Sequence, residues 1–147
     1  MQPDEFIVLS GKLAAMNLGA AGARSSVSRA YYGAFHLAMK ILDEFATAPP
    51  ANGQGHNLVP AFLESAGNEE LSEAASLLQD LHSARIKVDY RIGDLNVESA
   101  EYARAELEVA HEIQSRLATY AAACRSSETV RTSLIEGVAK TRAQRKC

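Results

Sequence analysis

The sequence has no tryptophan, four prolines and only two cysteines, Cys124 and Cys147, among its 147 residues. Two cysteines cannot form the disulfide framework that holds many small secreted domains together, so a reducing compartment is expected. No apolar run approaches the ~18 residues that a membrane-spanning helix needs, which argues against membrane insertion. The opening MQPDEFIVLSGKL carries acids where a signal peptide would carry positive charge. These absences together predict a cytoplasmic protein.

The chain also lacks a large net charge, since 15 Lys and Arg residues stand against 18 Asp and Glu residues. The formal net charge of -3 does not by itself point to nucleic acid, so any RNA contact needs a local basic patch. Hydrophobic residues make up 47% and charged residues 22%, which is the balance of a folded globular domain.

Strand-like alternation is absent, whereas apolar residues recur three and four positions apart. The sequence therefore predicts an all-α fold, an antiparallel up-and-down bundle of about four to six helices. Residues 1–125 are expected to form the bundle, and residues 126–147 a C-terminal helical extension with a basic tail. The expected helices span residues 3–17, 26–45, 58–65, 69–90 and 97–125, with a further apolar face over 130–138 and a loop at 47–56.

Helix boundaries are predicted from residues that cap helix ends well. Ser25 or Ser26 is expected to cap the second helix, Asn68 the fourth and Asn96 the fifth. Gly67 is expected to end the short third helix, because glycine adopts the left-handed conformation found at helix C-termini.

The second expected helix carries polar residues on the side away from its apolar stripe. At roughly 100° per residue from Val27, Arg29 lies near 200° and His36 near 180°, whereas the stripe stays within about 60° of Val27. Arg29 and His36 are two turns apart and can reach a common point, with Tyr32 beside them. One interpretation is an ordinary solvated face. The other is a homodimer interface in which the pair binds phosphate or performs acid–base chemistry.

The fourth expected helix shows the opposite arrangement, because His82, Arg85 and Asp89 overlap its apolar stripe. A buried unpaired charge is costly, so Arg85 and Asp89 need partners. One interpretation is an Arg85–Asp89 ion pair that fixes the helix to its neighbours, with Tyr90 packed beside it. The other is a polar pocket in which Arg85 faces an anion and Asp89 holds it in place.

Other chemical signals are weaker. His56 stands at the start of the short helix, either as a ligand-facing residue or as an ordinary residue near the helix end. No Cys and His stand at zinc-ligand spacing, so no metal site is predicted. No Gly-rich phosphate loop, serine nucleophile motif or dinucleotide fingerprint is present, and no cofactor is predicted.

Three segments, SRAYYGAFHLA, GHNLVPAF and LHSARIKVDY, follow one another in a chain region of roughly 10–124. Their order and spacing resemble the HEPN superfamily, and most closely its small stand-alone bacterial members, whose second helix reads S-R-x-Y-Y-x-x-F and whose fourth reads R-x-x-x-D-Y. The resemblance implies a helical bundle that dimerises, with a polar cleft at the dimer interface. Many such relatives are RNA-cleaving toxins or effectors, often encoded beside a small nucleotidyltransferase that neutralises them, and others bind nucleotide or RNA without catalysis.

Catalytic relatives carry an Arg, four to six residues, and then a His. Arg29 and His36 have this spacing, whereas no His follows Arg85, where the chain reads IKVDYRIG. The resemblance thus implies Arg29, His36 and Arg85 as catalytic candidates. It implies a substrate- or nucleotide-binding group of Tyr32, His56, His82, Asp89 and Tyr90. Two hypotheses follow: a metal-independent ribonuclease of a toxin–antitoxin or defence pair, and a non-catalytic dimeric module that binds a nucleotide or a protein.

Overall fold

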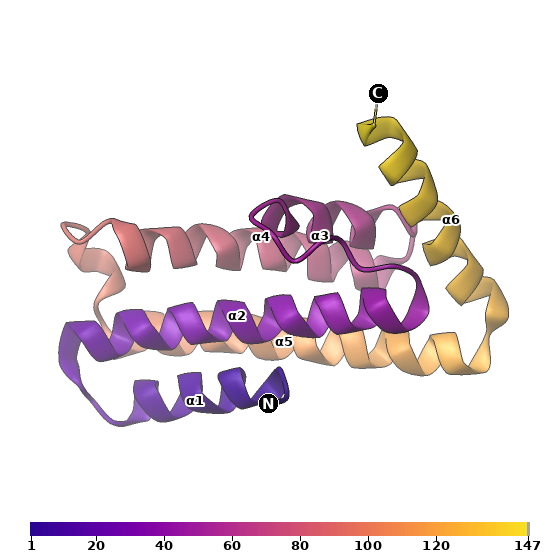
Figure 1. Cartoon of the computed structure of the whole chain (residues 1–147). Helices are drawn as coiled ribbons and strands as arrows, with labels where there is room; N and C mark the ends of the chain where they lie inside the picture. The colour runs from indigo at the N-terminus through magenta and orange to yellow at the C-terminus, as the bar shows by residue number, and fades with distance from the viewer. Residues whose placement is uncertain (147) are drawn as a thin grey trace.

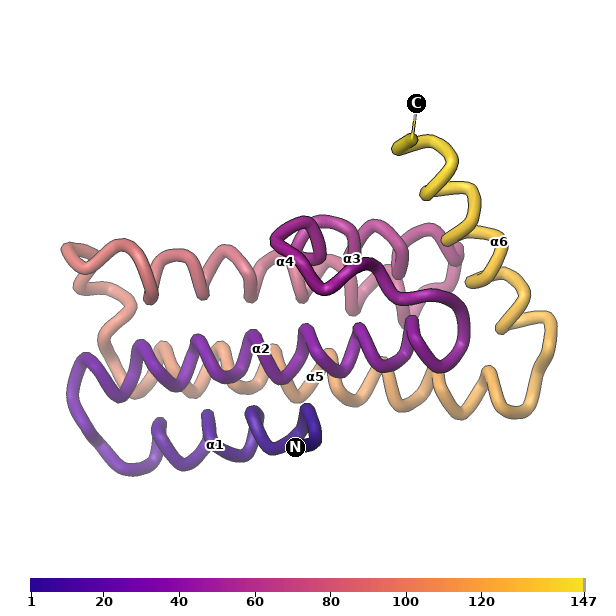
Figure 2. The backbone as a smooth tube through the Cα atoms, viewed as in Figure 1, coloured from indigo at the N-terminus to yellow at the C-terminus, as the bar shows by residue number. Residues whose placement is uncertain are grey.

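The computed structural model describes residues 1–146, and in this range it contains six α-helices and no β-strand. They are α1 (Asp4–Ala15), α2 (Gly19–Phe45), α3 (Gly55–Glu64), α4 (Glu69–Tyr90), α5 (Ala100–Ser126) and α6 (Glu128–Arg145), with a 3-10 turn at Leu95–Val97. Helices α1, α2, α4 and α5 run lengthwise in alternating directions, and α6 projects from one end (Figures 1 and 2). The predicted all-α helical bundle is therefore confirmed.

Helix α2 lies at the centre of the bundle and contacts α1, α4 and α5. Its predicted apolar stripe is buried along the whole helix: Val27, Tyr31, Ala34, Ala38, Ile41 and Phe45. The predicted stripe of α4 is buried as well: Leu71, Ala74, Ala75, Leu78 and Leu81. Both helices bury the apolar face that their sequences predict. The polar residues beside these two faces are therefore held in fixed positions relative to one another.

Two of the predicted helix starts are wrong. Helix α2 begins at Gly19, not at Ser25 or Ser26, because the positive φ of Gly19 (70°) makes the turn from α1. Ser26 is fully buried inside the helix, where its hydroxyl donates to the Ser10 carbonyl of α1. Asn96 lies in the 3-10 turn, and Ser99 instead caps α5 by accepting a hydrogen bond from the Tyr102 N–H.

The other boundary signals agree with the structure or shift by a few residues. Asn68 caps α4 as predicted, since its side chain accepts from the Leu71 N–H at 3.2 Å. Gly67 follows α3 with a φ of 61°, as expected of a glycine at a helix end. Helix α3 begins at Gly55, three residues before the predicted start, which places His56 inside the first helical turn.

The end of α4 is held by the guanidinium of Arg24, on α2. Arg24 is paired with the Glu98 carboxylate at 2.8 Å, and its side chain is only 13% exposed. It also donates to carbonyl groups in the last turn of α4 and the following segment, those of Lys87, Val88, Arg91, Ile92 and Asp94. These carbonyls include ones that the end of a helix leaves without intrahelical partners, so Arg24 fixes where α4 ends.

Helix α6 packs onto the bundle through Leu134 and Val138, which belong to the main buried cluster. Gly137 lies directly against the Ser65 backbone, where a Cβ atom would collide with the carbonyl group. The expected C-terminal extension therefore shares the core of the bundle. None of the helices in residues 1–146 is long and apolar enough to cross a membrane.

Candidate functional site

The ring of Tyr32, on α2, is the centre of the site because two arginines contact it. The guanidinium carbon of Arg29 lies 5.3 Å from the ring centroid, and that of Arg85, from α4, lies 5.4 Å away. Arg85 Nη2 also donates a hydrogen bond to the Tyr32 hydroxyl at 2.9 Å. Both distances are within the range of a cation–π interaction, so Tyr32 holds two positive charges close together.

His36 lies one turn after Tyr32 and is exposed to solvent. Its ring stacks on Tyr32 with a centroid distance of 6.3 Å and on Phe6 of α1 with 5.8 Å. Phe6 also lies 5.7 Å from the Arg29 guanidinium. Arg29 and His36 therefore share two aromatic neighbours, and the predicted convergence of these side chains occurs within one chain.

Arg85 is held between an acid and two hydroxyl groups. Its Nε lies 2.8 Å from Oδ2 of Asp89, with side-chain exposures of 12% and 27%, and its Nη2 also donates weakly to Tyr90 at 3.4 Å. The Nε–H is not aligned with the Asp89 oxygen, so this atom is buried without a hydrogen-bond partner within residues 1–146. The Asp89 carboxylate accepts instead from the Ser28 hydroxyl of α2 at 3.2 Å. Charge attraction thus orients Arg85, and one donor remains unused.

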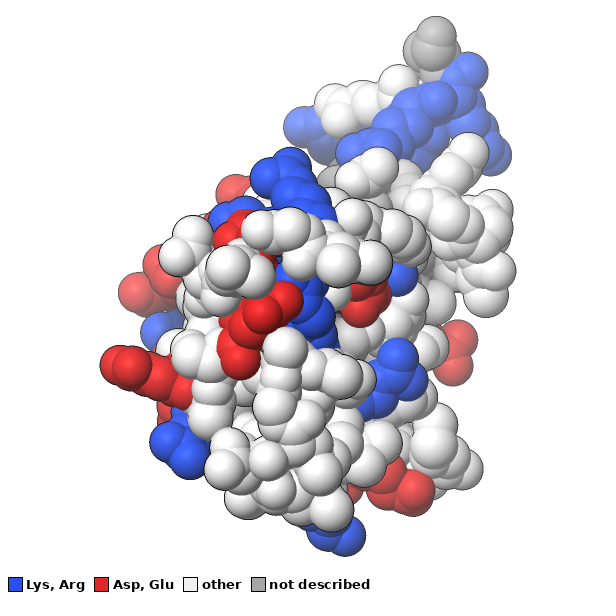
Figure 3. Space-filling view, turned by 90° about the vertical axis from the view of Figure 1, so that its left-hand side faces the viewer, with Lys and Arg blue, Asp and Glu red and all other residues white. Residues whose placement is uncertain are grey.

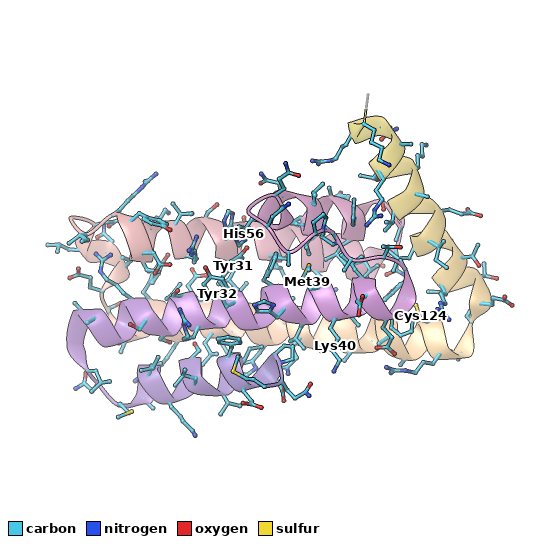
Figure 4. The ribbon with its side chains drawn as sticks, viewed as in Figure 1. Tyr31, Tyr32, Met39, Lys40, His56 and Cys124 are labelled. Atoms are coloured by element: carbon cyan, nitrogen blue, oxygen red, sulfur yellow. The ribbon has the colours of Figure 1, made fainter. Side chains whose placement is uncertain are left out.

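Two histidines complete the site on the side of α3 and α4. The rings of His56 and His82 are stacked at 5.1 Å with an interplanar angle of 11°. The Tyr31 hydroxyl forms a hydrogen bond with His56 Nδ1 at 2.5 Å, and Tyr31 itself is fully buried (Figure 4). Phe35 lies 5.0 Å from His56 and 5.5 Å from His36, so its ring is flanked by both imidazoles.

The surroundings of these imidazoles favour their neutral form. Burial, and then electrostatic interactions with Arg85 and His36, lower the pKa of His56. Burial, His56 and Arg85 lower the pKa of His82 in the same direction. Burial raises the pKa of Tyr31, so its hydroxyl keeps its proton. At neutral pH the site therefore offers two uncharged imidazoles beside fixed cations.

The structure brings all eight predicted residues into one connected set of contacts. The central group contains Arg29, Tyr32, His36, Arg85, Asp89 and Tyr90. His56 and His82 join it through Tyr31, whose ring lies 5.5 Å from that of Tyr32. His36 and Arg85 do not touch directly and are linked through Tyr32.

Sequence reasoning missed three contributors, Ser28, Phe35 and Phe6. Ser28 and Phe35 stand in the same S-R-x-Y-Y-x-x-F segment as Arg29 and Tyr32, so the motif itself was a usable signal. Tyr31 was expected only in the apolar stripe, yet its hydroxyl reaches into the site. Phe6 comes from α1, and no pattern in the sequence connects it with His36.

The surroundings of the site leave room for a ligand beside His36. A groove of about 530 Å³ is lined by Phe6 and His36 together with Met39, Lys40 and the first residues of the chain. Across residues 1–146, no group of three or more His, Cys, Asp and Glu side chains is arranged to hold a metal ion. The site includes imidazole, guanidinium and phenol groups, which bind anions and transfer protons.

Comparisons with protein families, with curated proteins and with solved structures found no match to this chain.

Proposed function

We propose that this protein is a HEPN-like ribonuclease and that the residues around Tyr32 form its catalytic site. The observation that carries the proposal is the convergence of Arg29, Arg85 and His36 on the one ring of Tyr32. Two guanidinium groups beside an accessible imidazole provide what cleavage of an RNA phosphodiester needs: binding of the phosphate and transfer of protons.

In this proposal the arginines bind the scissile phosphate. Arg29 and Arg85 carry fixed positive charge and planar donors that match phosphate oxygens. Their charge stabilises the extra negative charge that develops on the phosphorane-like transition state. Asp89 and Tyr32 orient Arg85, which reduces the reorganisation needed when RNA binds.

The imidazoles transfer the protons. His56, kept neutral by its surroundings, accepts the proton of the ribose 2′-hydroxyl on Nε2, which requires the tautomer with its own proton on Nδ1, the atom hydrogen-bonded to the Tyr31 hydroxyl. The 2′-oxygen then bonds to the adjacent phosphorus and the bond from phosphorus to the 5′-oxygen breaks. His36 donates a proton to that leaving oxygen. The products are a 2′,3′-cyclic phosphate and a 5′-hydroxyl, so no other reactant is consumed.

The same proposal includes a second copy of the chain and a cytoplasmic antitoxin partner. Large apolar side chains on and beside α1 are exposed, which suits a surface that pairs with another copy: Val8, Leu9, Met16 and Leu18. A small nucleotidyltransferase is the partner that the HEPN resemblance implies.

The test is cleavage of single-stranded RNA by the purified protein in the presence of EDTA. His36→Ala should lose cleavage by about a hundredfold or more, since general acid–base groups contribute about 10²–10⁴-fold. His111→Ala is the matched control, because His111 is an exposed histidine on α5 outside the site. Wild-type protein that cleaves no RNA and does not slow growth when expressed would refute the proposal.

A non-catalytic nucleotide-binding module is the second candidate. It is favoured by the ion pair and hydroxyl contacts that hold Arg85 in one position, as in a site that binds an anion without chemistry. Titration calorimetry with nucleotides and short RNAs distinguishes the two. Heat that disappears in Arg85→Ala, together with no cleavage by the wild type, would favour binding alone.

A further inference from the structure

A second polar groove lies outside the site, between α3 and the end of α6. Its volume is about 620 Å³, and it is lined by two amide side chains, Gln54 and Asn57, and three cations, Arg142, Arg145 and Lys146. Apolar contributions come from Phe62 and its neighbours. None of the three cations was assigned a role around Tyr32, so the groove is a separate feature of the molecule.

The cations of the groove belong to a strongly basic end of α6. After Glu136 the chain carries four cations and no acid up to Lys146. In Figure 3 the blue side chains stand together on the projecting end of α6, with no acidic side chain among them in that view. The overall charge of -3 therefore conceals the local basic patch that RNA binding requires.

Arg142 shows that this end of α6 is held in position. It donates to the Ala48 carbonyl at 2.9 Å, and its guanidinium lies 5.5 Å from the Phe62 ring. Arg145 and Lys146 are exposed and have no ion-pair partner among residues 1–146. Arg142 thus fixes one side of the groove, and the charges of Arg145 and Lys146 are available to a ligand.

The groove and the site each include a residue from the first turn of α3. His56 forms its hydrogen bond with Tyr31 in the site, whereas the next residue, Asn57, lines the groove. An extended strand that passes over this turn can contact both places. Neutral amides beside cations are the groups that contact the sugars, bases and phosphates of such a strand.

We propose that this groove binds the sugar–phosphate backbone of single-stranded RNA that flanks the segment held at the Tyr32 site. The inference rests on the proposed function for its choice of ligand. Arg145 and Lys146 contact phosphates, and Gln54 and Asn57 provide donors and acceptors for the ribose and bases. A single strand is favoured over a duplex because its backbone and its unstacked bases can both contact the cations and amides that line the groove.

The test measures binding separately from cleavage by using a 12-nucleotide RNA with 2′-O-methyl groups, which lacks the attacking hydroxyl. Fluorescence anisotropy with full-length protein is expected to give at least tenfold weaker binding for Arg145→Glu. Arg104→Glu makes the same charge change at an exposed residue of α5 that does not line the groove, and it should weaken binding less than twofold. Arg145→Ala should also reduce the slope of log affinity against log salt by about 0.7.

The outcomes separate the two proposals. If the wild type binds the oligonucleotide, and Arg145→Glu weakens this binding whereas the control variant does not, the groove proposal stands even when no RNA is cleaved. If Arg145→Glu and Arg104→Glu have equal effects, or if the wild type does not bind, the groove proposal is overturned even when RNA is cleaved. If Arg145→Glu lost affinity for an acidic peptide while its affinity for RNA stayed that of the wild type, the groove would be assigned to a protein partner instead.

Discussion

The Tyr32 hydroxyl accepts a hydrogen bond from Arg85 at 2.9 Å, which joins α2 to α4 in the middle of the site. The same ring also contacts Arg29 and His36, so the position of one phenol affects three of the four groups in the proposed mechanism, all except His56. The ring and the hydroxyl have separable roles: the ring holds the cations beside it, and the hydroxyl fixes the direction of Arg85.

Tyr32→Phe tests the hydroxyl alone. The ring remains, and one hydrogen bond to a charged group is lost, which is worth about 1.5–3 kcal/mol. RNA cleavage, measured well below the unfolding transition, should fall about tenfold or more, and the melting temperature should fall by several degrees, since ~1 kcal/mol shifts it by about 2–4 °C in a chain of this size. Tyr102→Phe on α5 is the control for loss of a phenol elsewhere, and an equal loss of cleavage there would contradict a specific role for Tyr32.

Arg24→Ala tests how α4 is positioned. It leaves the carboxylate of Glu98 and several carbonyl groups at the end of α4 without their donor. Urea unfolding should show a loss of about 3 kcal/mol, because partly buried polar groups lose a charged partner. Arg104→Ala, an exposed arginine on α5, should cost less than about 0.5 kcal/mol. Similar costs for both variants would show that Arg24 does not fix the helix end.

Stability should fall as the pH is lowered below about 6.5, the ordinary pKa of histidine. The pKa values of His56 and His82 are lowered in the folded protein, so the unfolded chain binds more protons between the folded pKa and 6.5. The stability that these residues contribute is therefore present above this interval and is lost on acidification through it. Urea midpoints measured at pH 7.5 and 5.5 should differ less in the double variant His56→Gln/His82→Gln, and His111→Gln should leave the difference intact.

Gly137→Ala tests how closely α6 packs against the end of α3. A Cβ at this position would meet the backbone carbonyl of Ser65, which cannot move freely. The variant should lose about 1–3 kcal/mol in urea unfolding, as overpacked positions do. Gly53→Ala is the control, since open space surrounds that position. No loss for Gly137→Ala would mean that α6 is not held where the groove requires it.

Much of the fold could be predicted because apolar spacing is a strong signal. The stripes of α2 and α4 follow directly from residues three and four apart, and both are buried as expected. The predicted starts of α2 and α5 are wrong because Ser26 and Asn96 have side chains that can cap a helix but lie elsewhere in the folded chain. Ser26 bonds to α1, and Asn96 falls in a turn held by Asp94.

The candidate site was predictable in its parts but not in its assembly. The outward position of His36 follows from the helical wheel, and its exposure agrees. The wheel cannot show that Tyr32 reaches Arg85 on another helix, because that depends on how α2 packs on α4. The polar cleft between two copies of the chain, which the HEPN resemblance implies, stays a prediction, and the contact that joins α2 to α4 at Tyr32 forms within one copy.

The most direct measurement of the central claim is identification of the cleavage products of a short RNA by mass spectrometry. The account predicts a 2′,3′-cyclic phosphate and a 5′-hydroxyl from the wild type and from Arg104→Ala, and uncleaved RNA from Arg85→Ala. Intact RNA from the wild type, or the same products at the same rate from Arg85→Ala, would contradict it.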